Sequence, residues 1–214
     1  MSASNRQRQL LDAALTVFSQ KGFKGATTKE IAAAAGVAEA VIFQHFPSKE
    51  ALYNAVLEFN LGAWETEQAV EDIGGYMERC DDEGLLRTFI LRILNCYRTN
   101  AAFQRVVLFA ALEGHEQGIR HLQKQFTPVF KQFKEYFEKR QREGAIVECD
   151  PIVILIGVGG IAHHYGLATS IMNAAVGDIS DETVAEQVTR VLLDGVRKRP
   201  PVKNTWNESK VPRQ

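Results

Sequence analysis

Apolar residues recur at spacings of three and four along most of the chain, which is the period of an amphipathic helix. One face of the stretch 6–21 shows this spacing at Leu10, Leu11, Ala14, Leu15 and Phe18. The same spacing returns in 85–94, 103–110 and 129–137, and no alternation typical of a strand interrupts it. The pattern therefore predicts an all-α protein.

Breaking and capping residues predict where the first helices end and begin. Gly22 follows the last periodic residue of a helix over 6–21 and is a stop signal. Thr27 and Glu30 have the spacing of a capping box, in which a hydroxyl and a carboxylate satisfy each other's backbone N–H groups. A second helix is expected to start there and to end at Gly36.

Further boundaries follow from proline, serine and glycine. The spacing predicts a third short helix over 38–45, because Pro47 prevents its continuation. Ser48 is a good N-cap for a fourth helix. The polar stretch 71–82 contains two adjacent glycines, and we expect a loop or domain junction there. Thr127-Pro128 is expected to open a later helix, since proline is tolerated in a first turn.

The segment 27–46 predicts two short helices joined by a tight turn at Gly36, where glycine adopts a positive φ without a Cβ clash. The positions that would meet between the helices are small or apolar: Ile31, Ala32, Ala35, Val37 and Ile42. Such a pair fits either a plain helical hairpin or a helix-turn-helix, whose second helix enters the DNA major groove. The tight turn, the alanine and polar positions of the second helix and the segment 46–50 favour the helix-turn-helix.

The composition is that of an ordinary soluble globular protein, with 45% hydrophobic and 24% charged residues among 214. The net charge is −1, so the chain as a whole is not expected to attract a polyanion. The charge balance is +1 over 1–60, −7 over 61–195 and +5 over 196–214. Any binding of nucleic acid must depend on the local placement of charge.

Signals for catalysis or for a metal site are weak. Cys80, Cys96 and Cys149 are odd in number and far apart, which disfavours a disulfide framework and favours a reducing cytoplasm. A nucleophile elbow, a P-loop, a dinucleotide fingerprint and carboxylates at metal spacing are not found in the sequence. We expect no enzyme activity, no metal and no cofactor.

A stretch of 27 residues between Asp150 and Asp178 carries no charge, which is long enough to raise the question of a membrane span. Polar residues and glycines interrupt it, so a helix buried in protein, at a subunit interface, is the better interpretation. The adjacent His163 and His164 fit packing, hydrogen bonding to a ligand, or a metal. Neighbours on a helix point about 100° apart, which disfavours a shared metal.

One signature in the N-terminal part has a family counterpart. It consists of Thr27-Thr28-x-x-Ile31-Ala32-x-x-Ala35-Gly36-Val37, then Ile42-Phe43-x-His45-Phe46-x-Ser48-Lys49-Glu50-x-Leu52. In this order and spacing, the chain over about 6–60 resembles the TetR family of bacterial one-component transcriptional regulators. The resemblance implies an N-terminal three-helix helix-turn-helix DNA-binding domain, which we place at 1–50, and a larger helical ligand-binding and dimerisation domain at 51–199. The polar tail 200–214 is expected to be disordered.

The resemblance also implies DNA contacts at particular positions. The implied set is Thr27, Thr28, Lys29, Glu39, Ala40, Val41, Phe43, Gln44, His45 and Lys49. Gln44 could pair with adenine, and Val41 could meet a thymine methyl group. The family often has serine or threonine at positions 38 and 41, glycine at 40 and tyrosine at 43. These departures predict fewer phosphate contacts and a strong dependence on salt.

For the larger domain, the resemblance implies a cavity and a twofold interface. Residues expected to line a ligand pocket are Phe89, Ile93, Tyr97, Phe103, Phe109, Phe130, Phe133, His163 and His164. Further polar candidates are Asn95, Glu113, His115 and His121. Residues expected at the dimer interface are Gly157, Gly160, His164, Val184, Val188, Val191 and Leu192. The small residues at the interface allow two helices to approach closely. For the pocket candidates the alternative stays open, because an aromatic residue at helical spacing packs in a core more often than it lines a pocket.

The function implied is that of a cytoplasmic homodimer that binds a palindromic operator in double-stranded DNA. We expect a repressor released by a small hydrophobic effector. The alternative is a DNA-binding regulator that has no small-molecule ligand and is controlled by a protein partner or by its abundance.

Overall fold

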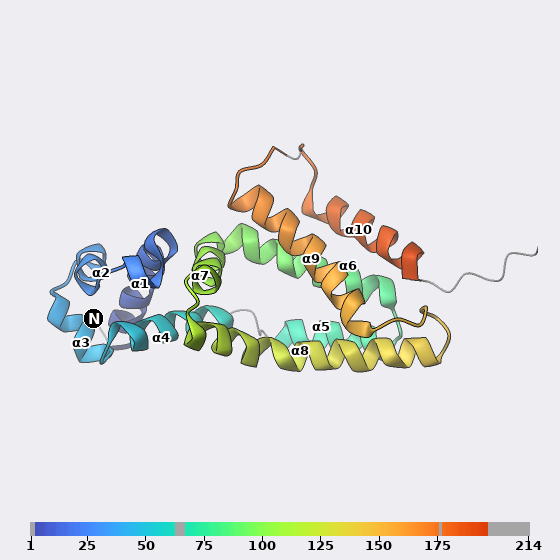
Figure 1. Cartoon of the computed structure of the whole chain (residues 1–214), viewed down its shortest axis with the longest axis horizontal. Coiled ribbons are helices and arrows are strands. Elements are labelled where there is room, and N and C mark those ends of the chain that lie inside the picture. Colours follow the sequence, from blue (N-terminus) through green and yellow to red (C-terminus); the bar gives the residue numbers. More distant parts are fainter. Residues whose placement is uncertain (1–2, 63–66, 176, 197–214) are drawn as a thin grey trace, which may run out of the picture.

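The computed structural model describes residues 3–62, 67–175 and 177–196, and this part of the chain forms ten α-helices (Figure 1). They are α1 Ala3–Gly25, α2 Thr28–Ala35, α3 Glu39–His45, α4 Lys49–Gly62, α5 Glu67–Glu78, α6 Asp82–Thr99, α7 Ala101–Leu112, α8 Glu116–Arg142, α9 Pro151–Ser170 and α10 Asp181–Val196. The predicted all-α fold is confirmed. The molecule is elongated, with α1–α3 at one end and α4 and α7 leading to the rest (Figure 1).

A first hydrophobic core forms where α1–α4 meet. Its fully buried side chains include Leu10, Phe18, Ile31, Ile42, Leu52 and Tyr53. Burying a side chain of this size stabilises a fold by about 1.5–3 kcal/mol. Phe103 and Val106 of α7 join the same core, so α7 packs against the N-terminal half. The domain division expected at residue 50 runs through this core and stays a prediction.

A second core holds the larger half together, with α9 packed against α6, α8 and α10. Among the described residues, α9 is the one helix long and apolar enough to cross a membrane by length and composition. One of its faces is buried in this core through Ile154, Leu155, Val158 and Ala162. The uncharged stretch is thus a packed helix, as expected, while its outer face stays exposed.

Two predicted boundaries are wrong. The stretch 71–82 is not a loop, because α5 runs to Glu78 and its half-buried Ile73, Tyr76 and Met77 pack against the second core. The chain turns only at Cys80, where φ is 54°. A contact face at helical spacing outweighs the two glycines in this segment.

Thr127-Pro128 does not open a helix either. Pro128 lies inside α8, which begins at Glu116 behind an N-cap by His115. Proline removes one backbone hydrogen bond, and half-buried Leu122 and Val129 keep the apolar face continuous across it. This packing maintains a single long helix.

The sequence predicted the first helix only approximately. Gly22 does break the helical geometry, with φ 69° and ψ −176°, but one more turn follows and α1 ends at Gly25. The Ser48 hydroxyl accepts a hydrogen bond from the backbone N–H of Ala51 at 3.0 Å, which confirms it as the cap of α4. The tail expected over 200–214 lies outside the described residues.

Candidate nucleic-acid interface and internal cavity

The turn between α2 and α3 is built from local hydrogen bonds. The Thr27 hydroxyl accepts from the backbone N–H of Glu30 at 3.2 Å, and the Glu30 carboxylate accepts from the backbone N–H of Thr27 at 3.1 Å. This confirms the capping box. Gly36 ends α2 in the left-handed region at φ 66°, and the backbone N–H of Val37 donates to the carbonyl of Ala32 at 3.0 Å. These contacts aim α3 away from α2.

The carboxylate of Glu30 also joins α2 to α1. Lys21 of α1 donates a hydrogen bond to it, which is the main cause that lowers the pKa of Glu30, followed by the hydrogen bond from Thr27. The side-chain amide of Gln9 donates to the carbonyl of Ala35 at 2.8 Å, at the other end of α2. Both ends of α2 are therefore held to α1.

Helix α3 presents most of its surface to solvent. Ile42 is its buried side chain and anchors it to the first core. Exposed positions are Glu39, Ala40, Phe43 and Gln44, and half-buried ones are Val41 and His45. Phe43 is 48% exposed, which is unusual for so large an apolar ring. The predicted contact residues of α3 thus lie on an accessible helix at one end of the molecule (Figure 1).

The start of α2 lies beside the start of α3. Thr27 and Lys29 are exposed there, and Thr28 is half-buried. The Thr28 hydroxyl donates a hydrogen bond to the Glu39 carboxylate. Ala38, the N-cap of α3, makes no side-chain hydrogen bond, as expected from the missing hydroxyl. An acidic side chain in the first turn offsets this, since it interacts favourably with the helix dipole.

Lys49 makes contacts that the sequence did not reveal. Its ammonium donates to the carbonyls of Phe23 at 2.8 Å and Ala26 at 2.9 Å, and lies 4.4 Å from the centroid of the Phe23 ring. Two of its three N–H bonds therefore hold the end of α1 to the start of α4. Lys49 supports the helix-turn-helix from behind.

The turn between α7 and α8 docks onto the end of α1. Glu113 accepts hydrogen bonds from the backbone N–H groups of Phe23 at 2.9 Å and Lys24 at 3.2 Å. His115 packs against the rings of Phe23 and Tyr53. Glu113 and His115 are therefore junction residues, and neither lines the cavity, because the turn faces α1.

His115 is held in one orientation at this junction. Its Nδ1 accepts from the backbone N–H of Gly118 at 3.0 Å. Its Nε2 lies 3.2 Å from the Glu50 carboxylate of α4. With Nδ1 accepting, the proton of a neutral ring belongs on Nε2, where it points at Glu50.

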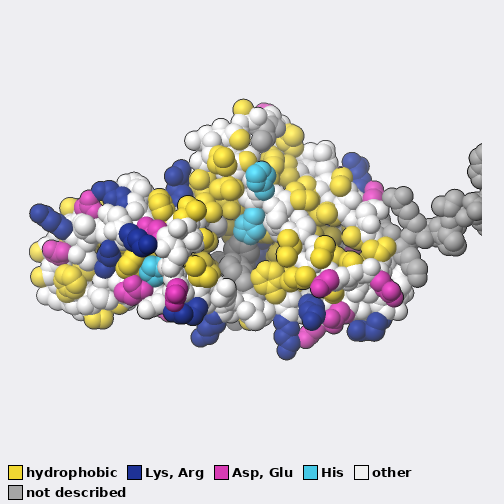
Figure 2. Space-filling view, viewed as in Figure 1, with side chains coloured by type: hydrophobic (Ala, Val, Ile, Leu, Met, Phe, Trp, Pro, Cys, Tyr) yellow, Lys and Arg dark blue, Asp and Glu magenta, His cyan; other side chains and the backbone are white. Residues whose placement is uncertain are grey.

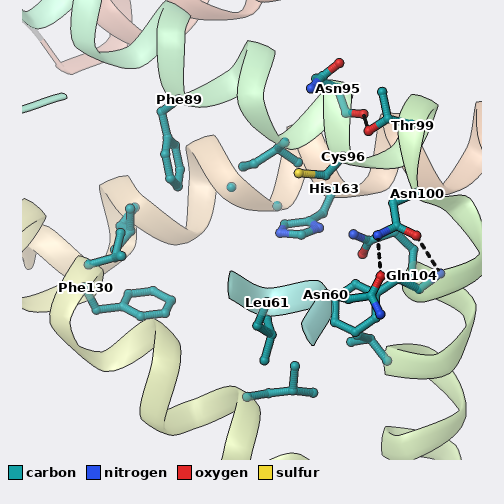
Figure 3. A pocket seen from close by; sticks show the side chains of 18 of the residues that line it. Asn60, Leu61, Phe89, Asn95, Cys96, Thr99, Asn100, Gln104, Phe130 and His163 are labelled. Atoms are coloured by element: carbon teal, nitrogen blue, oxygen red, sulfur yellow. Dashed lines mark hydrogen bonds between the residues drawn. The ribbon is translucent and has the colours of Figure 1, made fainter. Parts of the chain in front are cut away.

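A cavity of about 410 Å³ opens between α4, α6, α7, α8 and α9. Its lining residues are Asn60, Leu61, Phe89, Ile93, Asn95, Cys96, Thr99, Asn100, Phe103, Gln104, Val107, Leu122, Val129, Phe130, Leu155, Ile156, Gly159, Gly160 and His163. Figure 3 shows His163 projecting into it between an aromatic side, with Phe89 and Phe130, and an amide side, with Asn60, Asn100 and Gln104. This size and mixed lining are typical of a small-molecule site.

The structure brings together part of the predicted pocket. Phe89, Ile93, Phe103, Phe130 and His163 line the cavity, as does Asn95. The other predicted residues lie elsewhere: Phe109 near Gly22 of α1, Phe133 fully buried between Phe89 and Phe137, and His164 on the exposed surface. Tyr97 stands behind the lining, and its hydroxyl lies 3.3 Å from Nδ1 of His163.

Three amides of the cavity, Asn60, Asn100 and Gln104, were not predicted from the sequence. Asn100 caps α7 by accepting from the backbone N–H of Phe103 at 3.4 Å, and it donates to Asn60 at 2.9 Å. Gln104 follows one turn later. The available signal was a glutamine within the nearly uninterrupted apolar run of 101–112. An apolar helix that carries a lone amide on its inner face has to place that amide somewhere polar.

The titratable groups at the cavity are neutral at pH 7. Desolvation lowers the pKa of His163, whose ring projects into the cavity although the residue is partly exposed to solvent. Burial raises the pKa of Cys96 to about 11 and also raises the pKa of Tyr97. Within the described residues, no group of three or more His, Cys, Asp or Glu could hold a metal ion.

The residues expected at a dimer interface lie on α9 and α10. Gly160, His164 and Val191 are exposed, and Val191 is 67% exposed. Gly157, Val188 and Leu192 are half-buried, whereas Val184 is only 8% exposed and packs in the second core of its own chain. Figure 2 shows hydrophobic side chains gathered over the larger half of the molecule, while Lys and Arg side chains are frequent at the end formed by α1–α3.

Known proteins resemble this chain both in its N-terminal part and over most of its length. The sequence profile of bacterial regulatory proteins of the tetR family matches residues 10–56. The transcriptional regulator RutR of Escherichia coli K12 is 26% identical over 203 residues, covering 92% of this chain and 93% of RutR. The nucleoid occlusion factor SlmA of Salmonella typhi is 28% identical over 144 residues, covering 65% of this chain and 70% of SlmA.

Solved structures share the fold over nearly the whole chain. The fatty acid degradation regulator FadR of Bacillus halodurans aligns with a TM-score of 0.63 at 20% identity, covering 93% of this chain and all of that one (100%). The ketosteroid transcriptional regulator KstR2 of Mycobacterium tuberculosis aligns with a TM-score of 0.62 at 16% identity, covering 93% and 98%. The helical half that the sequence profile does not reach therefore has the same architecture in these proteins.

Proposed function

Because this chain belongs to the TetR family of bacterial regulatory proteins, we propose that it is a cytoplasmic homodimeric repressor that leaves its operator when a small molecule fills the cavity. The observation that carries this proposal is the accessible helix α3, whose buried Ile42 fixes it while Glu39, Ala40, Phe43 and Gln44 stay exposed. A helix fixed on one side and open on the other suits the major groove.

Each predicted DNA contact has a role in this proposal. Thr27, Thr28 and Lys29 bind phosphate at the start of α2, where Thr27 and Lys29 are exposed. Gln44 pairs with an adenine edge, and Val41 meets a thymine methyl group. Glu39, Ala40 and Phe43 face base edges or sugar from the same helix, and His45 contacts the DNA backbone. Lys49 positions α4 against α1, and its third N–H is available for a phosphate.

The second copy of the chain docks on the outer face of α9 and α10. Exposed Val153, Ile161 and Val191 make this face apolar, and Gly157 and Gly160 allow close approach. A four-helix arrangement of α9, α10 and their twofold copies sets two α3 helices about 34–36 Å apart, one turn of DNA. The operator is then a palindrome.

Release by a ligand follows from the shared position of α7. Phe103 of this helix lines the cavity and also joins the first core, and Glu113 just beyond its end holds the end of α1. A ligand that displaces α7 therefore moves α1 and, with it, the helix-turn-helix. Coupling free energies of such sites are typically about 1–3 kcal/mol.

The DNA-binding part is tested by fluorescence anisotropy with duplex from the region upstream of the protein's own gene. Gln44→Ala is compared with Gln132→Ala, which removes an exposed glutamine from α8 in the other half of the molecule. We expect Gln44→Ala to weaken specific binding about tenfold or more, as the loss of about 1–3 kcal/mol at one base pair implies. Equal affinities of both variants and the parent protein would overturn the assignment of α3.

A second candidate function lacks the small molecule. The relative SlmA is named a nucleoid occlusion factor and not a transcriptional regulator. A related chain can therefore have a role other than transcriptional regulation. In this alternative, a protein partner or the abundance of the regulator controls DNA binding. Thermal shift against a library of small apolar compounds separates the two, because a true ligand stabilises the folded protein by mass action.

A further inference from the structure

Gln104 is a polar side chain of the cavity that is nearly buried and forms no side-chain hydrogen bond. Its side chain is only 9% exposed, and the carboxamide has no hydrogen-bond partner among the residues that the structure describes. Figure 3 shows Gln104 and His163 entering the same cavity from α7 and α9. Its amide atoms are open to the cavity and not sealed inside the protein, so they are available to hydrogen-bond a ligand there.

The neighbouring amides are already satisfied, and this makes Gln104 distinct. The Asn60 side chain donates to the carbonyl of Val56 at 2.8 Å and accepts from Asn100 at 2.9 Å. Asn100 in turn caps α7. These bonds engage the side chains of Asn60 and Asn100, whereas the donor and the acceptor of Gln104 remain available to a ligand.

The described lining of the cavity offers no counter-ion to a charged ligand. Among the residues that the structure describes there, none is Lys, Arg, Asp or Glu. His163 is neutral at pH 7 because desolvation lowers its pKa, and its Nδ1 faces the hydroxyl of Tyr97. The charged head of a free carboxylate or of an amine would gain no counter-ion from these side chains, whereas an uncharged head needs none.

The opposite side of the cavity suits an apolar body. Phe89 and Phe130 face it (Figure 3), and Leu155 and Ile156 complete this side from α9. Phe89 is held in place by fully buried Phe133, whose ring centroid lies 4.7 Å away. Aromatic and aliphatic side chains of this kind bind hydrocarbon or ring portions of a ligand without directional demands.

We infer that the cavity binds an uncharged amphipathic molecule whose head is a carbonyl with an adjacent N–H, as in an amide or lactam. Gln104 binds this head with its donor and acceptor side by side, His163 adds a contact from α9, and the apolar body lies between Phe89 and Phe130. The inference rests on the proposed function, because it names the chemical class of the ligand for that same cavity.

The test compares probes that differ only in the head group: octanamide, octanoate and octylamine, titrated calorimetrically into the dimer at pH 7.5. The protein is compared with Gln104→Leu, which replaces the amide by an apolar side chain of similar size, and with Gln132→Leu on the outer surface of α8. We expect octanamide to bind at least tenfold more tightly than either charged probe. Gln104→Leu should lower its affinity about tenfold, the size of one lost hydrogen-bonding interaction, and Gln132→Leu should leave it unchanged.

The outcomes that overturn the ligand class differ from those that overturn the proposed function. Octanoate or octylamine binding as tightly as octanamide overturns it, as does unchanged octanamide affinity in Gln104→Leu or binding of none of the three probes. Operator binding is measured on the same samples by anisotropy. Gln132→Leu should bind operator like the parent protein. A failure of the ligand class leaves operator binding by the parent protein intact, whereas a failure of the proposed function appears as no operator binding by the parent protein or by Gln132→Leu.

Discussion

The carboxylate of Glu113 accepts a hydrogen bond from the backbone N–H of Phe23 over 2.9 Å. This contact joins the residue after α7 to the end of α1, two segments 90 positions apart in the sequence. Lys24 strengthens it by donating from its side chain to the backbone carbonyl of Glu113 at 3.0 Å. The junction gives the cavity helix α7 a direct mechanical connection to the DNA-binding end.

The junction requires glycine at position 22. A Cβ on Gly22 would lie 2.2 Å from a carboxylate oxygen of Glu113 and 2.9 Å from the Phe109 ring. Its φ of 69° with ψ −176° is also a conformation almost confined to glycine. We expect Gly22→Ala to lower the free energy of unfolding by about 2–4 kcal/mol, measured by urea denaturation.

Gly36→Ala is the matched control for this substitution. Gly36 also has a positive φ, 66°, but a Cβ there meets nothing within 4 Å. Its replacement should cost only the backbone penalty of about 1–2 kcal/mol. Equal losses for the two alanine variants would contradict a steric role of Glu113 at the junction.

We expect Lys49 to contribute more to the stability of the fold than to DNA binding. Lys49→Met removes two hydrogen bonds from an ammonium to the carbonyls of Phe23 and Ala26, and we expect a loss of about 2–3 kcal/mol in the free energy of unfolding. Exposed Lys29→Met should leave the unfolding transition in place and reduce the salt slope of DNA binding by about 1. A Lys49→Met protein as stable as the parent would show that these bonds contribute nothing.

Glu39 places a negative charge on the surface that faces DNA in the proposed function. Glu39→Gln removes this charge and keeps an oxygen that can accept the hydrogen bond from Thr28. We expect the affinity for random-sequence duplex to rise about three- to fivefold at low salt, as a single charge near phosphate implies. Glu135→Gln on α8 makes the same change in net charge at an exposed site of the larger half, and an equal rise there would show that placement is irrelevant.

His163 should make stability depend on pH. Its pKa is lowered in the folded protein by desolvation, so below about pH 6.5 the unfolded chain binds more protons than the folded one. The free energy of unfolding therefore falls as the pH is lowered through this range. Cys96 does not contribute, because burial raises its pKa to about 11.

The measurement is the midpoint of urea denaturation between pH 5 and 7.5 for the parent protein and for His163→Gln, which keeps a polar group in the cavity. The stability of the variant should fall less steeply toward low pH than that of the parent protein. Parallel curves for the two proteins would mean that His163 is as easily protonated in the folded protein as in the unfolded chain.

The cavity shows why part of the ligand site could not be predicted from the sequence. Phe89 and Phe133 have the same residue type and the same helical spacing within their stretches, yet Phe89 lines the cavity and Phe133 is fully buried behind it. Which ring faces the cavity depends on how far α6 and α8 are rotated against α9. That rotation is set by the packing of all three helices, and periodicity along one helix carries no information about it.

The N-terminal half was predictable because its signals act over one turn of chain. The Thr27–Glu30 capping box, the positive φ at Gly36 and the Ser48 cap each involve neighbours in sequence, and so the amino-acid sequence alone determined the helix-turn-helix, the all-α class and the family resemblance. Contacts between distant segments were decided only in the folded molecule: Glu113 at the end of α1, Lys49 behind the turn, and Gln104 without a partner in the cavity. These depend on which helices meet and at what angle, since the hydrophobic burial that brings them together has no direction of its own.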